Sequence, residues 1–429
     1  MPMPTTNRDL VARSLAAVWH PCTQMKHHER FPLVPIVKGE GAWLIDVDGH
    51  RYLDAVSSWW VNLFGHANPR INAALKDQLD QLEHVMLAGF THEPVIALSE
   101  RLAKLTGLGH AFYGSDGASA VEIALKMSFH YWRNSGGRDK KAFVSLQGSY
   151  HGETLGALAV TDVAIFRNSY GALLNNNFNV PFPAADDAGA GALERLLAER
   201  HGEIAALIVE PLVQGAAGMR MYDAAWLKRA SELCTRYQVH LIADEIMTGF
   251  GRTGSMFACE QAGIRPDFMC LSKGITGGYL PLSCVLTTDP IYAAFYDDDM
   301  ARGFLHSHSY TGSALACRAA LATLDIFEND RVIDANRERA REFSQQAEAI
   351  RAHPCVENFR QLGMIWAFDM KTGKTTFARE FFAAALKRGV LLRPIGKTVY
   401  FMPPYVVTAE EFAWLVTQTL GAIDEVVKA

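Results

Sequence analysis

The sequence predicts an α/β protein whose large domain is a mostly parallel sheet with helices on both faces. Three observations lead to this fold class. Several short runs in the middle of the chain, among them IAALIVEP and VHLIADEI, are apolar throughout. Segments with helical periodicity, about 10–15 residues long, separate these runs. Strands that lack a polar side are typical of parallel sheets, because both faces of such sheets are covered.

The N-terminal part of the chain predicts a hairpin followed by two helices. Asp48-Gly49, a common turn dipeptide, lies between the strand-like runs IVKGEGAWLIDV and HRYLD. A helix is predicted over 68–85, where a proline suits the first turn and apolar residues recur at helical spacing. A second helix is predicted over 93–107, because a glycine suits the end of a helix.

Strands and helices alternate through the middle of the chain, as a parallel sheet requires. The predicted strands contain AFYG, KAFVSL, IAALIVEP, VHLIADEI and FMCLSK, and the helices between them contain AVEIALKMSFHYW, LERLLAERHGE and AAWLKRASELCTRYQ. The stretch over 183–193 predicts a loop. From about Val332 mixed helices and strands return. We therefore expect a large domain over 67–329 and a smaller α+β domain formed by 1–66 together with 330–429.

Composition limits the classes of protein that the chain can represent. Its 429 residues are 49% hydrophobic, and 41 basic against 46 acidic residues give a net charge of −5, which argues against nucleic-acid binding. The seven cysteines are scattered and form no Cys-x-x-Cys pair, as in a reducing compartment. We see neither a secretory signal nor a run long enough to span a membrane, so we expect a cytoplasmic protein.

Candidate ligand-binding residues follow the apolar runs, because ligands bind at the carboxyl ends of strands in an open parallel sheet. Gly117 and Ala118 lie in GSDGAS, which opens a helix. Backbone N–H groups at a helix N-terminus can bind a phosphate. Tyr150 and His151 follow KAFVSL and could face a planar ligand. A helix cap and a surface loop are the ordinary structural alternatives for these two segments.

Two ionisable residues end later runs of the same kind. Asp244 ends VHLIAD, and a buried carboxylate needs a partner, such as a cation, a metal or a protonated ring nitrogen. Lys273 ends FMCLSK, and a desolvated lysine is a nucleophilic amine that can form a Schiff base. A salt bridge and a lysine that reaches solvent are the structural alternatives. An anion cradle, a flat aromatic, a carboxylate and an amine together suit pyridoxal phosphate.

These residues also carry a resemblance to a known family. LIADEIMTGFGRTGSMFACE, followed by LSKGITGGYLPLS with Lys273 29 residues after Asp244, resembles the class III aminotransferases. The resemblance covers nearly the whole chain and implies fold type I of the pyridoxal-phosphate-dependent transferases. WHPCTQM, SSWW, GSYHGETLGA and RPIGKTVYFMPPY are similar to biotin-pathway members of the family. This similarity implies that 8-amino-7-oxononanoate is converted to 7,8-diaminononanoate, with S-adenosylmethionine as amino donor or, as in some relatives, lysine.

The resemblance implies a role for each candidate residue. Lys273 would form the Schiff base, Asp244 would pair with the pyridinium nitrogen, and Tyr150 would pack on the cofactor as a third catalytic residue. The remaining cofactor contacts would be Gly117, Ala118, His151, Glu210, His308 and Ser309. The last two would reach the phosphate from the other subunit, so a homodimer is expected. The substrate contacts would be Cys22, Trp59, Tyr150, Lys273, Ser307, Arg393 and Tyr400, with Arg393 holding a carboxylate.

The chain departs from the family pattern at three places. Cys22 stands where the family often has Tyr. Ala118 replaces the usual Ser or Thr, so only its backbone N–H could bind phosphate. HSHSYTG differs from the commoner Gly-Pro-Thr pattern, which leaves Ser307 and His308 as backbone contacts, whereas Ser309 keeps a hydroxyl group.

Parts of the sequence also fit other functions. An ω-amino acid:pyruvate or ornithine-type aminotransferase would share Lys273 and Asp244. The stretch over 249–254 fits the G-x-G-x-x-G pattern of NAD-dependent dehydrogenases, but it does not directly follow a strand. The histidine pairs 27–28 and 306–308 have no clear third ligand, so no metal site is predicted. A cofactor-binding regulator without catalytic activity is the remaining alternative.

Overall fold

The structure is a computed structural model, and it describes all residues except 1–5, 32, 176, 184–187 and 429. The chain forms two compact units. One comprises Met1–Pro69, Glu338–Gln361 and Ile365–Ala429, and the other comprises Arg70–Arg337 and Leu362–Met364. We call them the terminal unit and the central unit.

The central unit is built on a seven-stranded sheet in the order β4-β12-β11-β10-β7-β5-β6. Its strands are β4 (His110–Gly114), β5 (Ala142–Leu146), β6 (Phe178–Val180), β7 (Ile204–Val209), β10 (His240–Asp244), β11 (Phe268–Leu271) and β12 (Ser283–Thr287). Parallel pairing joins β6, β5, β7, β10 and β11. Only β12 runs antiparallel to its neighbours, β11 and β4. The predicted mostly parallel sheet is therefore confirmed.

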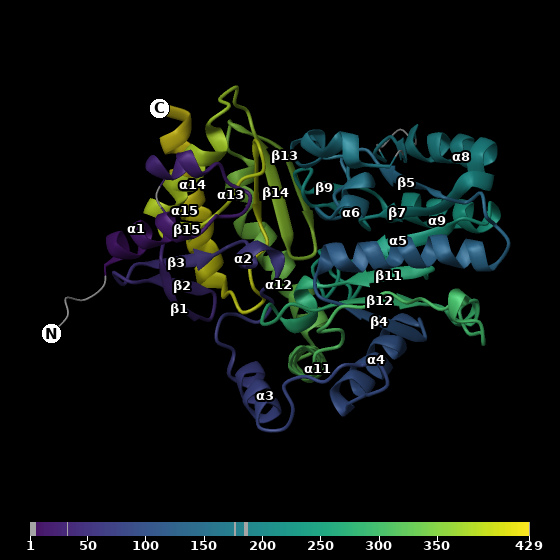
Figure 1. The fold of residues 1–429 in the computed structure, drawn as a ribbon. Coiled ribbons are helices and arrows are strands. Elements are labelled where there is room, and N and C mark those ends of the chain that lie inside the picture. Colours follow the sequence, from purple (N-terminus) through teal and green to yellow (C-terminus); the bar gives the residue numbers. More distant parts are fainter. Residues whose placement is uncertain (1–5, 32, 176, 184–187, 429) are drawn as a thin grey trace. The chain divides into compact units, whose positions relative to one another are not determined.

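Helices cover this sheet. The longer ones are α3 (Pro69–Leu79), α4 (Glu93–Thr106), α5 (Gly117–Asn134), α8 (Ala188–Arg200), α9 (Ala224–Arg236) and α11 (Ala314–Asn329). Helix α5 packs along β4, β12, β11, β10 and β7 (Figure 1). Its Val121, Ile123 and Ala124 enter a buried cluster with Ile242 and Phe268, so α5 is held firmly against the sheet.

Two sequence predictions in the central unit need correction. The helix predicted over 68–85 ends at Leu79, although it begins at Pro69 as expected. The loop predicted over 183–193 is partly helix, because α8 begins at Ala188; residues 184–187 lie outside the described part of the chain. Alanine is the strongest helix former, so AGAGAL can continue a helix despite its glycines. Gly107, with φ +70°, ends α4 as predicted.

Shorter elements connect these strands and helices. They are α6 (Leu155–Ala159), α7 (Ala164–Arg167), α10 (Asp289–Ala293), β8 (Val213–Gln214), β9 (Arg220–Met221), and the 3₁₀ helices η2 (Asn168–Leu173), η3 (His201–Glu203), η4 (Ala258–Ala262), η5 (Lys273–Thr276) and η6 (Met300–Arg302). Only η5 separates β11 from β12. A connection this short suits the antiparallel return of β12, because parallel neighbours need a long crossover.

The terminal unit has two small sheets. One is β1 (Ile36–Glu40), β2 (Trp43–Asp46), β3 (Arg51–Asp54) and β15 (Val390–Leu391), and the other is β13 (Val356–Leu362), β14 (Ile365–Met370) and β16 (Thr398–Phe401). The predicted hairpin is confirmed, since β2 and β3 pair antiparallel around Gly49, whose φ is +89°. Because β15 pairs with β3, the C-terminal part of the chain completes a sheet that the N-terminal part begins.

Helices and aromatic rings complete the terminal unit. They include α1 (Asn7–Ala17), η1 (Met25–Glu29), α2 (Ser57–Trp60), α13 (Glu348–Arg351), α14 (Phe377–Lys387) and α15 (Ala409–Lys428), while α12 (Val332–Gln346) contains the boundary between the two units. Phe343 stacks on Phe412 with ring centroids 4.2 Å apart, and Trp366 and Phe401 pack on the same Phe412 ring. Within the described residues, no helix is long and apolar enough to cross a membrane.

Candidate active site

Lys273 lies just past the end of β11, as the sequence predicts. It is the first residue of η5 and has a positive φ of +47°, so the chain turns sharply where this lysine stands. The side chain is half-buried, and burial lowers the pKa of its amine to about 8. The nearby carboxylates of Asp244 and Glu210 act in the opposite direction on that pKa. The result is an amine that loses its proton far more easily than an ordinary lysine.

Asp244 and His151 form a buried pair at the ends of two strands. Asp244 ends β10, and His151 lies in the loop after β5. The Nδ1 atom of His151 lies 2.7 Å from Oδ2 of Asp244, while Oδ1 of Asp244 accepts a hydrogen bond from the backbone of Ile246. The N–H of His151 also donates to the Thr161 hydroxyl oxygen, which fixes the loop. Both side chains are almost fully buried, so the carboxylate is held in one orientation.

Glu210 follows β7 and is also buried. Its Oε2 atom accepts a hydrogen bond from the N–H of Tyr150, and its Oε1 atom accepts one from the N–H of Gly215, each at 3.0 Å. Burial raises the pKa of Glu210 to about 7, with His151 lowering it and Asp244 raising it. Tyr150 donates its hydroxyl proton to Glu153, and its ring lies 5.1 Å from that of Phe166. Glu210 thus positions the backbone that carries Tyr150.

The predicted phosphate cradle is the first turn of α5. Asp116 caps this helix by accepting a hydrogen bond from Ser119. Gly117 and Ala118 come first in the helix, where backbone N–H groups have no partner within the helix. The loop after β5 packs directly on this turn, because a Cβ atom on Gly152 would lie 2.6 Å from Cβ of Ala118. Residues after β4 and after β5 therefore form one surface.

His308 also lies beside this turn, in the same chain. Nδ1 of His308 is 3.2 Å from the Ser115 hydroxyl oxygen, and its other ring nitrogen is 3.2 Å from His306. Ser307 and Ser309 are exposed. Across the described residues no group of three or more His, Cys, Asp or Glu side chains could hold a metal ion, and His306 and His308 bond to each other instead.

The predicted substrate residues of the terminal unit form a second cluster. The Arg393 guanidinium lies 4.6 Å from the Trp59 ring and donates to the carbonyl oxygen of Cys22 at 3.0 Å. Tyr400 lies beneath these residues in β16, where its hydroxyl oxygen accepts a hydrogen bond from Trp60 at 3.0 Å. Tyr400 is 3% exposed, whereas Trp59 is 42% exposed. Within this unit Arg393 and Trp59 therefore form an exposed pair, and Tyr400 supports the neighbouring Trp60.

The backbone of α2 explains why Trp59 is exposed although the adjacent Trp60 is buried. Ser57, Ser58, Trp59 and Trp60 all have positive φ values between +46° and +75°. Four successive non-glycine residues in the left-handed region cost about 1–2 kcal/mol each. Sequence patterns do not predict this turn, because it contains no glycine. Strained backbone of this kind persists only where the surroundings impose it.

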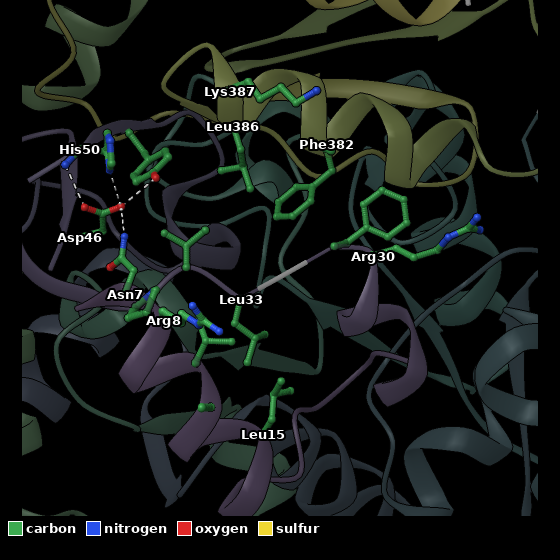
Figure 2. Close-up of a pocket in the computed structure, with 17 residues that line it drawn as sticks. Asn7, Arg8, Leu15, Arg30, Leu33, Asp46, His50, Phe382, Leu386 and Lys387 are labelled. Atoms are coloured by element: carbon green, nitrogen blue, oxygen red, sulfur yellow. Dashed lines mark hydrogen bonds and ion pairs between the residues drawn. The ribbon is translucent and has the colours of Figure 1, made fainter. Parts of the chain in front are cut away.

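Sequence reasoning missed the residues that hold this turn, and it missed a cavity in the terminal unit. Asp54 and His66 carry no motif; Asp54 contacts the turn, and His66 contacts Asp54, only in the folded chain. A cavity of about 700 Å³ lies in the terminal unit among α1, the segment after η1, and α14 (Figure 2). None of the predicted site residues lines it. Asp46 stands at its edge and accepts hydrogen bonds from Asn7, His50 and Tyr52 (Figure 2).

The central unit fits the chemistry of pyridoxal phosphate. It offers an amine with a lowered pKa at Lys273, a fixed carboxylate at Asp244, and backbone N–H groups at the start of α5. In addition, Nε2 of His151 is buried without a partner in the structure, and an uncompensated polar atom in a polar site suits a ligand. A protein of this fold with such a lysine belongs to the cofactor-dependent group-transfer enzymes.

The chain belongs to the class-III aminotransferase family. The sequence model of this family, described as "Aminotransferase class-III", matches residues 24–423. The adenosylmethionine-8-amino-7-oxononanoate aminotransferase of Helicobacter pylori is 48% identical to it, covering 98% of this chain and 99% of that protein. The protein of the same name from Anoxybacillus flavithermus is 41% identical, covering 97% and 96%.

Solved structures give the same family. The crystal structure of adenosylmethionine-8-amino-7-oxononanoate aminotransferase from Methanocaldococcus jannaschii matches with a TM-score of 0.94 and 35% identity, covering 97% of this chain and 98% of that one. An omega transaminase from Pseudomonas jessenii in complex with PMP matches with a TM-score of 0.93 and 27% identity, covering 98% of each chain. The predicted fold type and family are confirmed.

Proposed function

We propose that this chain is a pyridoxal-phosphate-dependent aminotransferase that converts 8-amino-7-oxononanoate to 7,8-diaminononanoate in biotin biosynthesis. The observation that carries the proposal is Lys273, a half-buried amine with a pKa lowered to about 8 beside two buried acids. The 48% identity to the Helicobacter pylori aminotransferase over nearly the whole chain supports the choice of substrate. The 27% identity to the Pseudomonas jessenii omega transaminase makes an ω-amino acid:pyruvate enzyme the second choice.

Each buried group of the central unit has a defined task in this reaction. When bound, the cofactor supplies a carbonyl that carries the amino group and a ring that accepts electrons. Asp244 holds the ring nitrogen in its protonated state, and His151 keeps the carboxylate in place from behind. The backbone N–H groups of Gly117 and Ala118 bind the phosphate, as a helix N-terminus can.

Lys273 is the proton carrier as well as the point of attachment. An amine with a pKa of about 8 is partly neutral near neutral pH, so Nζ can accept a proton from the α-carbon of the donor and return it. Glu210 holds the loop of Tyr150, and Tyr150 forms the aromatic wall of the ring site. An acid-base group is most effective when its pKa lies near the working pH, which this lysine satisfies.

The Arg393–Trp59 pair of the terminal unit binds the substrate carboxylate. Both amino donor and acceptor carry a carboxylate, so one arginine serves both halves of the reaction. One guanidinium nitrogen of Arg393 is bonded to Cys22, and Trp59 supports the flat face of the group. A guanidinium held on its face can still present an edge to a carboxylate in two parallel hydrogen bonds. The exposed Trp59 ring adds an apolar surface for the aliphatic chain of the acceptor.

We also propose a homodimer in which Ser309, and His308 through its backbone, serve the neighbouring subunit, while the His308 ring keeps its 3.2 Å contact with Ser115 of its own chain. Large apolar side chains are exposed along the stretch of chain that contains these residues, which supports an interface there: Tyr292, Tyr296, Met300, Leu305 and Tyr310. Mixing two inactive variants tests this. If Lys273→Ala and Ser309→Ala protomers exchange, hybrid dimers contain one intact site and regain activity. Mixtures that stay inactive although the protomers have exchanged would contradict a shared site.

S-adenosylmethionine is the proposed amino donor, and the cytoplasm is the proposed location. All seven cysteines are unpaired in the structure, which suits a reducing compartment. A panel of single half-reactions tests the donor and the substrate. The holoprotein is mixed with S-adenosylmethionine, lysine, ornithine, β-alanine or 7,8-diaminononanoate, and loss of the cofactor's aldehyde absorbance is followed. Conversion by S-adenosylmethionine and 7,8-diaminononanoate is expected, whereas conversion by β-alanine or ornithine alone would favour the second choice.

A further inference from the structure

The strained turn α2 holds Trp59 between two anchored neighbours. Ser58 is bonded to Asp54 on one side, and the Trp60 indole is bonded to Tyr400 on the other. Trp59 itself makes its ring contact with Arg393. The direction of the Trp59 side chain is therefore set by the left-handed backbone, and the backbone is set by the anchors. Whatever fixes the turn also fixes the Arg393–Trp59 pair.

Asp54 accepts two of the hydrogen bonds that anchor the turn. It ends β3 and is fully buried. Its Oδ1 atom accepts a hydrogen bond from the N–H of Ser58 at 2.9 Å, and Oδ2 accepts one from the Ser58 hydroxyl at 2.7 Å. Oδ2 also lies 3.0 Å from Nε2 of His66. One carboxylate thus receives three donors, two of them from a single residue of the turn.

The hydrogen bonds around His66 identify the tautomer that faces Asp54. The N–H of Gly65 donates to Oδ1 of Asn62, which orients the Asn62 amide so that its NH₂ group faces Nδ1 of His66. An NH₂ group can only donate, so Nδ1 accepts and the proton lies on Nε2, which donates to Asp54. The His66 side chain has room because residue 39 is glycine; a Cβ there would lie 2.4 Å from Cβ of His66.

We propose that Asp54 is a positioning residue for substrate binding, which rests on the function proposed above. Its carboxylate holds α2 in the left-handed turn, the turn presents Trp59, and Trp59 supports the guanidinium of Arg393. Asp54 touches neither substrate nor cofactor in this scheme. It acts on the affinity for a substrate carboxylate and leaves cofactor binding in the central unit unchanged.

Asp54→Asn tests the proposal, because it keeps the volume and removes one acceptor. Its NH₂ group would face either Ser58 or the N–H of His66, and two donors repel each other. We expect the KM for 8-amino-7-oxononanoate to rise about tenfold or more, with kcat changed less than about threefold. The absorbance of the bound cofactor and its dissociation constant should stay at the wild-type values. Ser58→Ala removes one of the three donors and should give a smaller rise in KM.

A matched control is available in the same sheet. Asp46 in β2 is also a buried aspartate that accepts hydrogen bonds from His50 and other donors (Figure 2), and among the described residues its bonds go to Asn7, His50 and Tyr52, not to α2. Asp46→Asn should lower the melting temperature as much as Asp54→Asn does, without a change in KM. If both variants raise KM equally, the effect of Asp54 is general destabilisation and the proposal is wrong.

A double-mutant cycle separates positioning from structure in a second way. If Asp54 acts through Arg393, Asp54→Asn should change KM by less than about twofold once Arg393→Ala is present. Multiplication of the two effects would overturn the proposal. A wild-type holoprotein that cannot convert 8-amino-7-oxononanoate would instead overturn the proposed function. In that case the direct binding of a simple aliphatic carboxylate, measured by calorimetry on both variants, still decides whether Asp54 controls the Arg393–Trp59 pair.

Discussion

The central and terminal units prepare their site residues by opposite means. In the central unit, Asp244 ends a strand, Lys273 and Glu210 follow strand ends, and burial shifts the pKa values of Lys273 and Glu210. In the terminal unit, Arg393 and Trp59 keep ordinary exposed side chains, and the backbone beneath Trp59 is unusual. The central unit shifts the pKa values of buried groups, whereas the terminal unit orients exposed groups on a left-handed turn.

This difference shows which property of each region a substitution should change. Buried ionisable groups determine reactivity, so changes in the central unit should lower kcat and alter the cofactor spectrum. Oriented surface groups determine recognition, so changes in the terminal unit should raise KM and leave the spectrum alone.

The largest effect is expected for Lys273→Ala. Loss of the amine removes both the attachment point and the proton carrier, so kcat should fall by roughly 10⁴-fold or more. Mass spectrometry of borohydride-reduced wild type should find the coenzyme on the peptide that contains Lys273. Lys140 is the control, since burial also lowers its pKa to about 8, but its amine bonds only to the carbonyl oxygens of His201, Ile204 and Gln238. Coenzyme attached to Lys140 would disprove the assignment.

Asp244→Asn should give the next largest effect. The amide cannot hold a proton on the ring nitrogen, so we expect kcat to fall about 10²–10³-fold. Single-turnover absorbance with one amino donor measures this directly. Asp267→Asn is the control, because Asp267 accepts a hydrogen bond from Leu241 at the other end of the β10–β11 pair. A rate within about tenfold of wild type for Asp244→Asn would argue against pairing with the ring nitrogen.

Arg393→Ala should affect recognition and not reactivity. Removal of the guanidinium should raise the KM for 8-amino-7-oxononanoate by about 10- to 100-fold with kcat nearly constant. Steady-state kinetics with both substrates provides the measurement. Arg51→Ala is the control, because Arg51 lies over Trp43 at 4.7 Å in the same unit without belonging to the proposed site. An unchanged KM in Arg393→Ala would remove this arginine from substrate binding.

The smallest effect concerns stability and pH. Burial raises the pKa of Glu210 to about 7 from 4.5, so the folded chain keeps a proton that the unfolded chain has already lost. Stability of the apoprotein should therefore fall as the pH rises from about 4.5 to 7, by at most about 3 kcal/mol from this group. Urea unfolding at the two ends of this range should show a smaller difference for Glu210→Gln than for wild type. Equal differences would mean that Glu210 does not titrate in this way.

The sequence was sufficient for most of the central unit and for little of the strained turn. The candidate residues Lys273 and Asp244 can be recognised in the sequence because each lies at or just after the end of an apolar run that predicts a strand. The antiparallel direction of β12 could not be seen, since strand direction depends on the length of a connection and not on the strand itself. The left-handed turn α2 depends on Asp54 and His66, whose contacts form only after β3 and the following loop have folded.

Gly152 has a consequence for how the central unit can move. With φ +120° and no side chain, it allows the loop after β5 to rest directly on Ala118 at the start of α5. The segments that we assign to the phosphate and to the ring are therefore in steric contact, and neither can shift without displacing the other. A bulkier residue at position 152 or 118 should push the two segments apart. It should therefore weaken binding of both the phosphate and the ring of the coenzyme.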